Sequence, residues 1–445
     1  TIFLPIIFIL YWFVTNRNLR LQNLLLLVAS YFFYGWWDWR FLFLIAFSSF
    51  VDYFVGLGLA KTDNKAQRKL LLLTSIIINI GFLGFFKYFN FFAENFVKAF
   101  TFFGHPIDDP SLLNIILPVG ISFYTFQTLS YSIDVYKRKL EPTKDFIAFF
   151  AFVSYFPQLV AGPIERATNL LPQFYKKRNF EYEKSVDGMR QILWGLLKKI
   201  VIADNCAMYA NDIFTNYSNY SGSTLLLGAL FFAFQIYGDF SGYSDIAIGT
   251  ARLFGINLMR NFAFPYFSRD IAEFWRRWHI SLSSWFRDYV YIPLGGSLGS
   301  KWQKIRNIFI IFIVSGFWHG ANWTFIVWGA LNAIYFLPLM LMNKNRDNTN
   351  TVAEGRLLPS LKEILQIVIT FFITLIAWVF FRAESLSIAV DYILGIFSRS
   401  LFTPTQIFPG GFIILLIVFV IIEWLQREKQ HALQFDTSTI SKKVR

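Results

Sequence analysis

The sequence predicts an all-α, polytopic integral membrane protein, and three observations carry this prediction. Hydrophobic residues make up 55% of the chain, charged residues only 16%, and the mean hydropathy is +0.46. This is more apolar surface than a soluble core of this length can bury. Apolar runs close to the length of a membrane-spanning helix recur from one end to the other. The runs are continuous in Leu, Ile and Phe, without the alternation of a membrane β-barrel, so the spans are expected to be helical.

The first five apolar runs alternate with basic connections. We expect spans at 2–14, 21–37, 41–59, about 70–86 and about 112–133. The basic residues Arg17 and Arg20, the segment 61–69 and the cluster 137–139 follow the first, third and fifth runs. The positive-inside rule places these connections in the cytoplasm and the N-terminal end outside. The stretch 87–104 is amphipathic and is expected to lie along the outer interface.

Beyond residue 140 the simple alternation fails. The run 146–162 is short and contains Pro157, which favours a re-entrant or tilted element packed inside the protein. In 224–258, one span at about 224–237 is followed by Asp239 and Asp245, where we expect the helix to break. Residues 261–296 are too charged to span and are expected to form amphipathic helices at the cytoplasmic surface.

The last part of the chain returns to apolar runs. Spans are expected at about 307–325, 323–342, 362–381 and 410–425, with a polar loop at 343–360 and a short interfacial helix at 386–397. We find no internal repeat and no second domain. The chain 1–445 is therefore predicted to be one membrane domain with roughly 10 to 12 spans.

Charge and motif content exclude several other classes. The net charge is +13, but the basic residues lie in short clusters between apolar runs, which indicates membrane topology and not nucleic-acid binding. A single cysteine, Cys206, excludes an intramolecular disulfide and a CxxC site, and we expect it to be a small core residue. With four histidines and no HExxH, no metal site is predicted. Serine hydrolase, ATPase and Rossmann motifs are also missing.

His319 lies in the stretch SGFWHGANW, residues 315–323, between two apolar runs. It follows Arg306 by 13 residues, which is about 20 Å along a helix and places it near mid-membrane. An ionisable residue at that depth indicates a functional site. Gly316 and Gly320 permit close approach of helices or substrate, and Trp318 and Asn322 are expected to help bind the substrate. The alternative is a histidine that only hydrogen-bonds across the helix bundle.

His279 lies in FWRRWHISLSSWFRD, among cations and tryptophans. Such a cluster can bind phosphates while the aromatic faces cover a base or an acyl chain. The residues concerned are Arg276, Arg277, Arg287, Trp278 and Trp285. An interfacial helix that binds lipid headgroups explains the same pattern equally well.

Four more ionisable residues draw attention. Asp239 and Asp245 flank a Ser-Gly-Tyr segment and are candidates for proton relay or ion binding, or else form a charge pair or a cap. His105 and His431 are expected to be surface residues.

Several stretches together resemble the membrane-bound O-acyltransferases over nearly the whole chain. They are QTLSYSIDVYK (127–137), PQLVAGPIER (157–166), DFSGYSDIAIG (239–249), FWRRWHISLSSWFRDYVYIPLGG (274–296), GFWHGANWTFIVWG (316–329) and FFRAESL (380–386). Within that family the chain is most similar to the alginate, peptidoglycan and exopolysaccharide O-acetylation branch. The resemblance implies a fold built around a tunnel through the membrane, with His319 as the catalytic histidine and His279 as the second family histidine.

The resemblance also implies the reaction and its partners. The donor is expected to be acetyl-coenzyme A or another acyl thioester on the cytoplasmic side, as a co-substrate and not a bound cofactor. A periplasmic or extracellular acetyltransferase is expected to pass the group to a polysaccharide. The location is expected to be the bacterial inner membrane, in contact with lipid. D-alanyl transfer to teichoic acid, a lipid or sterol acyltransferase, and a secondary transporter remain as alternatives.

Overall fold

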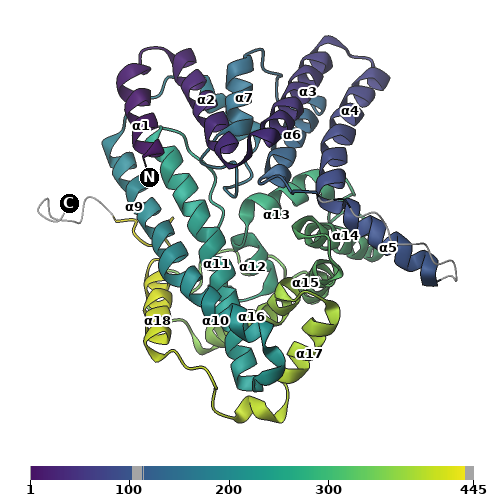
Figure 1. The fold of residues 1–445 in the computed structure, drawn as a ribbon, viewed down its shortest axis with the longest axis vertical. Helices are drawn as coiled ribbons and strands as arrows, with labels where there is room; N and C mark the ends of the chain where they lie inside the picture. Colours follow the sequence, from purple (N-terminus) through teal and green to yellow (C-terminus); the bar gives the residue numbers. More distant parts are fainter. Residues whose placement is uncertain (1, 103–112, 114, 436–445) are drawn as a thin grey trace, which may run out of the picture. The chain divides into compact units, whose positions relative to one another are not determined.

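The computed structural model describes residues 2–102, 113 and 115–435. Every regular element in these ranges is helical, and the described chain contains no β-strand (Figure 1). The predicted all-α class is therefore confirmed. Short 3₁₀ and π segments, labelled η, join several of the helices.

Five helical stretches of the described chain are long and apolar enough to cross a membrane: Leu19–Lys61, Lys65–Phe102, Gly222–Leu253, Trp323–Leu341 and Leu361–Arg382. Three shorter apolar helices are Phe3–Val14, Leu386–Ile396 and Gly410–Leu425. The multi-pass membrane class is confirmed. The first stretch contains two 20-residue helices, α2 (Leu19–Asp38) and α3 (Leu42–Lys61), joined by η2 (Trp39–Phe41). The total of roughly 10 to 12 spans stays a prediction.

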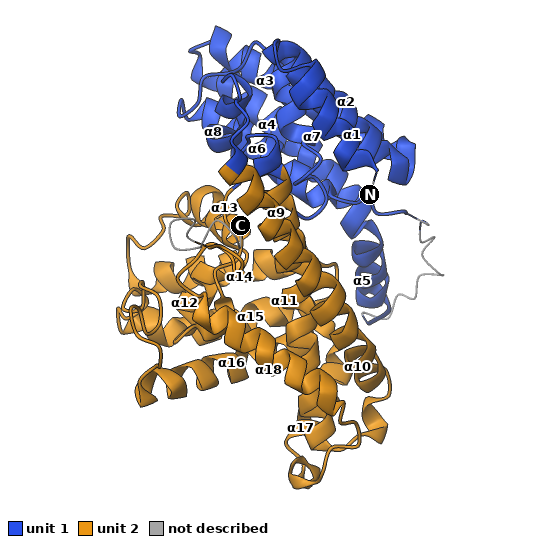
Figure 2. Cartoon of the chain, turned by 90° about the vertical axis from the view of Figure 1, so that its left-hand side faces the viewer, with its two compact units in different colours: residues 1–182, 251–258 blue, residues 183–250, 259–445 orange. Residues whose placement is uncertain are grey.

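The chain divides into two compact units, which Figure 2 draws in different colours. Unit 1 contains Thr1–Tyr182 and Ala251–Leu258, and unit 2 contains Glu183–Thr250 and Met259–Arg445. That both units act as one membrane domain stays a prediction.

Unit 1 contains further helices, and three helices of the unit begin at a side-chain cap. The further helices are α1 (Phe3–Ile9), η1 (Leu10–Val14), α4 (Lys65–Leu83), η3 (Gly84–Tyr88), α5 (Phe89–Phe102), α6 (Ile121–Tyr136), α7 (Phe146–Ser154), α8 (Ala167–Leu170) and η4 (Leu171–Phe174). The side chains of Asn18, Asn64 and Asp145 accept backbone N–H groups at the starts of α2, α4 and α7. Such caps satisfy donors that a helix leaves unpaired.

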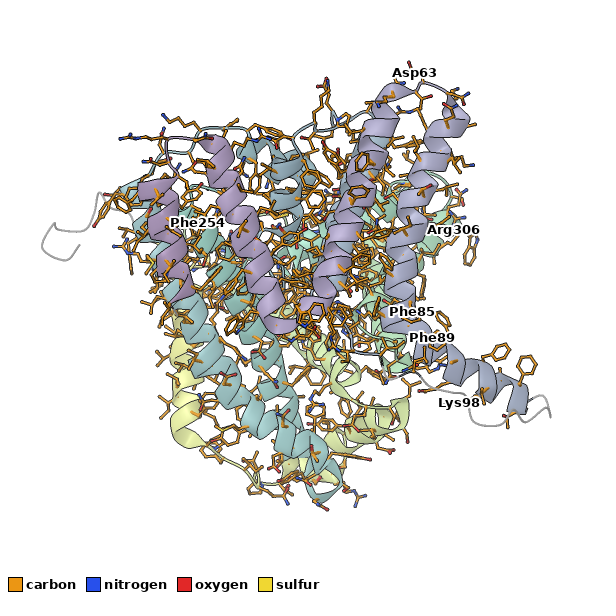
Figure 3. All side chains as sticks on the ribbon, turned by 45° about the horizontal axis from the view of Figure 1, so that its top comes forward. Asp63, Phe85, Phe89, Lys98, Phe254 and Arg306 are labelled. Atoms are coloured by element: carbon orange, nitrogen blue, oxygen red, sulfur yellow. The ribbon has the colours of Figure 1, made fainter. Side chains whose placement is uncertain are left out.

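The α4–α5 region bends, as Figure 3 shows between the labelled Phe85 and Phe89. The π segment η3 separates the two helices there. In α5, Phe92, Phe96 and Phe100 are exposed at helical spacing, so the helix is amphipathic as expected. Residues 103 and 104 of the predicted amphipathic stretch lie outside the described residues, and its interfacial position stays a prediction.

Among the described residues, which do not include 112 and 114, the predicted span at about 112–133 is helical only from Ile121 onward. Helix α6 starts at Ile121, directly after Gly120, whose φ is +76°. A Cβ on Gly120 would lie 2.6 Å from the carbonyl oxygen of Leu159, so both the conformation and the space require glycine. The helix therefore starts where this turn ends, and residues 115–118 are irregular.

The run 146–162 does not form a span. Helix α7 has nine residues, and mostly buried turns follow it up to Arg166. This fits the expected re-entrant element, because irregular backbone is tolerated inside a membrane protein only where protein or water satisfies it.

Unit 2 is built around a long helix that the sequence analysis expected to be broken. Helix α11 (Gly222–Leu253) runs through Asp239 and Asp245 without interruption, so the predicted break is wrong. A continuous helical stretch that was not predicted packs against it, made of α9 (Tyr182–Leu196), η5 (Leu197–Ala203) and α10 (Asp204–Thr215).

Glycines bring these two stretches into backbone contact. A Cβ on Gly195 would lie 2.5 Å from the carbonyl oxygen of Gly242, and a Cβ on Gly242 would lie 2.8 Å from that of Gly195. Small residues at such crossings are typical of helix pairs in membranes.

The other elements of unit 2 follow in chain order. They are η6 (Tyr217–Asn219), η7 (Pro265–Phe267), α12 (Ile271–Arg277), α13 (Ile280–Phe286), η8 (Arg287–Tyr291), α14 (Lys301–His319), α15 (Trp323–Leu341), α16 (Leu361–Arg382), α17 (Leu386–Ile396), η9 (Arg399–Phe402) and α18 (Gly410–Leu425). The short helices α12 and α13 occupy the segment predicted to be amphipathic.

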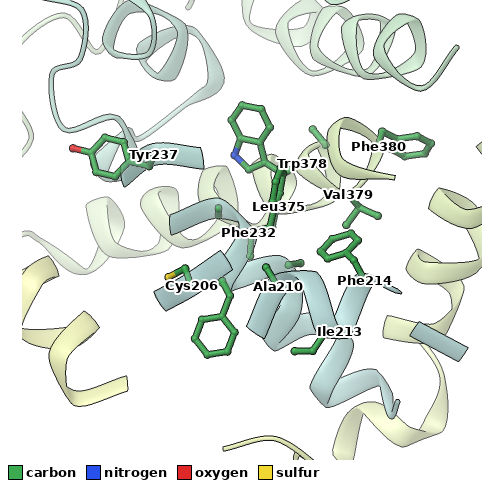
Figure 4. Packing of buried hydrophobic residues seen from close by; sticks show 14 of the residues in the cluster. Cys206, Ala210, Ile213, Phe214, Phe232, Tyr237, Leu375, Trp378, Val379 and Phe380 are labelled. Atoms are coloured by element: carbon green, nitrogen blue, oxygen red, sulfur yellow. The ribbon is translucent and has the colours of Figure 1, made fainter. Parts of the chain in front are cut away.

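The apolar core of unit 2 forms around α10, α11 and α16. Figure 4 shows part of it, with Cys206, Ala210 and Ile213 from α10, Phe232 and Tyr237 from α11, and Leu375 and Trp378 from α16. Cys206 is fully buried, which confirms that it is a core residue.

Candidate functional site

His319 ends helix α14, and the chain reverses directly after it. Gly320 is extended, Asn322 caps α15, and α15 begins at Trp323. The predicted spans 307–325 and 323–342 are thus two separate helices that end and begin around a short turn. Gly316 allows the hairpin to close, since a Cβ there would meet the carbonyl oxygen of Phe325 on α15. The imidazole is therefore held at the tip of a tightly packed hairpin.

Aromatic rings surround the half-buried His319. The centroid of its ring lies 4.9 Å from that of Trp318, 5.3 Å from that of Trp328 and 5.1 Å from that of Phe381. These residues come from α14, α15 and α16, so three helices fix the position of the imidazole.

His279 lies between α12 and α13 in a left-handed conformation, with φ of +45° and ψ of +53°. His279 is 1% exposed. Asn261 holds it: the Nδ1 atom of His279 lies 3.1 Å from the Oδ1 atom of Asn261. The same oxygen accepts the backbone N–H of Ser281 at 3.2 Å and its hydroxyl at 2.8 Å. The Nδ2 atom of Asn261 donates to Ser244 on α11 at 3.0 Å.

These hydrogen bonds fix the tautomer of His279. A backbone N–H only donates, so the atom of Asn261 that faces Ser281 is the carbonyl oxygen. The hydrogen of the neutral ring is therefore assigned to Nδ1, which lies 3.1 Å from that oxygen and farther, at 3.4 Å, from the hydroxyl of Ser281. In the neutral ring, Nε2 is the nitrogen with a free lone pair. This atom is buried and has no hydrogen-bond partner among the described residues.

The protonation state of His279 follows from its surroundings. Burial lowers the pKa of His279 well below its ordinary value, and the nearby charge of His319 lowers it further. The ring is therefore neutral near pH 7, because a buried imidazole without an acidic partner resists protonation.

Both histidines contact Trp318. The ring centroid of Trp318 lies 6.1 Å from that of His279 and 4.9 Å from that of His319. We call the following group the Trp318 cluster: His279, Trp318, His319, Trp328 and Phe381. The structure thus brings together three of the predicted site residues that lie in two separate motifs.

Asn322 makes two structural contacts. Its Oδ1 atom accepts the backbone N–H of Thr324 at 3.0 Å, and its Nδ2 atom donates to the carbonyl of Glu384 at 3.0 Å. It therefore caps α15 and ties the hairpin to the connection after α16. Its predicted role in substrate binding stays a prediction.

The three predicted phosphate-binding arginines are not equivalent. Arg276 donates to the carbonyls of Asn345 and Asn348 at 2.8 and 2.6 Å. Arg277 pairs with Glu273 at 2.8 Å and donates to the carbonyl of Asn350 at 3.0 Å. Both guanidinium groups thus hold the 345–350 loop.

Arg287 differs from this pair. Its side chain is 60% exposed and, within the described chain, forms an ion pair only with the neighbouring Asp288, at 2.7 Å. Arg276 is exposed as well, but its guanidinium is bound to the 345–350 loop, whereas that of Arg287 makes no bond to this loop within the described chain.

The two predicted tryptophans differ as well. Trp278 is buried in the core of unit 2, with its ring 5.0 Å from that of Trp378 and 5.1 Å from that of Phe262. Trp285 is also buried and packs 5.0 Å from the ring of Tyr289. Direct substrate contact by either ring stays a prediction.

Asp239 and Asp245 form ion pairs with two lysines of η5. The Nζ atom of Lys199 lies 2.6 Å from Asp239, and that of Lys198 lies 2.5 Å from Asp245. Gln191 adds a bond to Asp245 at 2.7 Å. Of the alternatives left open by the sequence, this geometry favours the charge pair. A proton-relay role stays a prediction.

His431 is not a surface residue. It is 2% exposed, and its Nε2 atom lies 3.1 Å from the carboxylate of Asp187 on α9, because the tail folds back onto unit 2. His105 lies outside the described residues. Within the described ranges, no group of three or more His, Cys, Asp or Glu side chains converges as a metal site.

Asn261 was not predicted from the sequence as a site residue. It precedes His279 by 18 residues and shares no helix with it, so no spacing rule connects the two. Only the folded backbone, in which the N–H of Ile280 donates to the carbonyl of Asn261 at 2.9 Å, brings them together.

Comparison with known proteins identifies the class. The model of the membrane-bound O-acyltransferase family matches residues 142–382, more than half of the chain, and this segment contains His279 and His319. The chain belongs to the membrane-bound O-acyltransferase family. It is a membrane-bound acyltransferase, as predicted.

Individual relatives show which branch of the family the chain resembles. A probable alginate O-acetylase of Pseudomonas aeruginosa is 42% identical over 87% of this chain and 71% of its own length. A peptidoglycan O-acetyltransferase of Helicobacter pylori is 37% identical over 88% of this chain and 77% of its own length. A teichoic acid D-alanyltransferase of Bacillus subtilis is 29% identical over 62% of this chain. The resemblance to the O-acetylation branch is confirmed.

Proposed function

We propose that the protein takes an acetyl group from acetyl-coenzyme A at the cytoplasmic face and passes it across the bacterial inner membrane for O-acetylation of a polysaccharide. The observation that carries the proposal is the Trp318 cluster, in which two histidines from separate motifs contact one tryptophan ring. The names of the relatives at 37 to 42% identity support acetyl as the group and a polysaccharide as the final acceptor.

His319 acts as the general base in this proposal. It removes the proton of an acceptor hydroxyl as the oxygen attacks the thioester carbonyl. The C–O bond forms, the C–S bond breaks, and the departing thiolate takes the proton from the imidazolium. The products are the acetyl ester and free thiol, so atoms and charge balance. Positioned base catalysis of this kind contributes about 10²–10⁴-fold.

His279 orients the donor. Because Asn261 receives its Nδ1–H, the neutral ring presents Nε2 as an acceptor. It can accept an amide N–H of the pantetheine arm, but it cannot donate to an oxyanion unless it gains a proton, which burial opposes. This arrangement favours orientation over oxyanion stabilisation.

The donor's phosphates are assigned to Arg287. Arg276 and Arg277 are engaged with carbonyl groups of the 345–350 loop, whereas Arg287 keeps most of its surface accessible. An arginine is suited to phosphate because its planar fork donates two parallel hydrogen bonds.

A separate extracytoplasmic acetyltransferase receives the acetyl group before the polymer does. We propose this partner because the resemblance to the polysaccharide O-acetylation branch implies one. D-alanyl transfer is the second candidate, supported by the relative that is 29% identical. The two are distinguished by supplying the purified protein with an acetyl thioester or a D-alanyl thioester.

The test compares three histidine variants at equal expression. His319→Gln is expected to lower polymer acetylation in cells and thioester consumption by purified protein by about 10²–10⁴-fold. His279→Asn is expected to raise the KM for the donor. His431→Gln is the matched control, since it removes a buried histidine that pairs with Asp187. Full acetylation by His319→Gln would rule out the base, and a transporter would tolerate this change.

A further inference from the structure

Unit 1 contains a cavity whose walls combine basic and aromatic side chains. Its volume is about 380 Å³, and it lies between the α1–η1 helix and the segment 177–180. Three cations line it, Arg17, Lys177 and Arg178, together with the rings of Trp12 and Phe180. No carboxylate is among the lining residues.

Arg178 is a buried charge that forms no ion pair with a carboxylate of the described residues. It is 6% exposed, and its guanidinium lies 5.4 Å from the ring centroid of Tyr11 and 5.7 Å from that of Phe174. One nitrogen, Nη2, donates to the side chain of Asn23. Its Nε and Nη1 atoms have no hydrogen-bond partner among the described residues. Buried charges are normally paired, so a guanidinium with two unused donor atoms is suited to bind an anion.

An exposed apolar stripe leads from the cavity along α1. Ile2, Ile6, Ile9 and Phe13 recur every three or four residues, and their exposed fractions are 74, 50, 55 and 76%. Residues at this spacing share one face of a helix. Phe13 also lines the cavity, so the stripe and the basic site are continuous.

We propose that this cavity binds the headgroup of an anionic phospholipid, with the phosphate beside Arg178 and the acyl chains along the α1 stripe. A cationic site next to a lipid-facing row fits an anionic amphiphile better than a soluble anion. Basic pockets beside membrane helices are known to bind acidic headgroups. The π segment η1 supplies one wall, and such segments are frequent at functional sites.

The test titrates the full-length protein in a neutral detergent with phosphatidylglycerol or phosphatidylcholine and follows binding by native mass spectrometry. Phosphatidylglycerol is expected to bind at least about tenfold more tightly. Removing two surface charges, with Arg17→Gln and Lys177→Gln, is expected to weaken its binding about 30-fold, at about fivefold for each charge.

The matched control removes two neighbouring charges that do not line the cavity, with Arg20→Gln and Lys176→Gln. It is expected to change the affinity less than threefold, and the conservative pair Arg17→Lys and Lys177→Arg is expected to retain binding. An equal loss in the control pair, or equal affinity for both lipids, would overturn the proposal. A third arm adds coenzyme A, and binding of it with the same charge dependence in place of the lipid would assign the site to a soluble phosphate compound.

Discussion

Removing the side chain of Asn261 is expected to damage both the stability and the activity of the protein. Asn261→Ala deletes the acceptor for three hydrogens, two from Ser281 and one from His279, and the donor to Ser244. At about 1 kcal/mol net for each bond, the loss is about 4 kcal/mol in the free energy of unfolding. The freed imidazole no longer holds its tautomer or direction, and misplacement of about 1 Å can cost about 10²-fold in rate.

The assay combines the thermal midpoint in detergent with the rate of acetyl transfer. Asn332→Ala is a matched control, because Asn332 is also buried but, among the described residues, its side chain makes a single hydrogen bond, to the carbonyl of Trp328 in its own helix. It is expected to lose about 1 kcal/mol. Asn261→Asp keeps the acceptor oxygen and is expected to retain more activity than Asn261→Ala.

A double variant separates positioning from general damage. In the His279→Asn background, Asn261→Ala is expected to cause little further loss of rate, since the ring that it positions is already gone. An equal loss of rate in both backgrounds would refute the positioning role. A normal thermal midpoint for Asn261→Ala would refute the energetic reasoning.

Three further perturbations test the frame around the site. Lys198→Met leaves the carboxylate of Asp245, whose side chain is 14% exposed, without its cation. The variant is expected to cost about 3 kcal/mol of stability, with partial recovery when Asp245→Asn is added, and an unchanged thermal midpoint would contradict the ion pair. Gly242→Val is expected to force α11 away from α9 and to abolish stable expression. Gly81→Ala, at a helical position with open space around it, is expected to be neutral or slightly stabilising. Equal expression of the two variants would contradict the close packing of α9 and α11. The pKa of His279 is lowered from 6.5 in the folded protein, so below about pH 6.5 the unfolded chain gains a proton at this histidine while the folded ring stays neutral. Stability is therefore expected to fall as the pH drops below about 6.5 toward the folded pKa. The same acid dependence of the thermal midpoint in His279→Asn would refute this.

The sequence predicted the elements that depend on local pattern. The apolar runs of α2, α3, α4, α15 and α16 were found close to their observed bounds, because length and hydropathy decide a span. His319 and Trp318 were identified together since they are neighbours in one motif. The core position of Cys206 was expected because a single cysteine excludes an intramolecular disulfide and a CxxC site.

Other features depend on contacts between distant segments. Asp239 and Asp245 made the middle of α11 look too polar for a helix, but Lys198 and Lys199 on the neighbouring stretch neutralise them, so the helix continues. The neighbouring stretch of α9, η5 and α10 is too polar to be recognised as a span from its hydropathy. Its position against α11 depends on the close contact between Gly195 and Gly242. No pattern in the sequence aligns the two partners.

The predicted phosphate site of Arg276, Arg277 and Arg287 also depends on contacts with a distant segment. The spacing of these arginines indicated a joint phosphate site, but the 345–350 loop folds back and its carbonyl groups occupy Arg276 and Arg277. The role of Asn261 could not be predicted either, because its hydrogen-bond partner His279 lies in a different part of the fold and not in the same helix.

The positive φ of His279 decides how this position should be mutated. Alanine at +45° adds backbone strain to the loss of the ring, so an alanine variant reports both effects as one. Asparagine tolerates the left-handed region, and glycine adopts it freely. A comparison of these two replacements with alanine would therefore separate the chemistry of the imidazole from the folding cost of the turn that carries it.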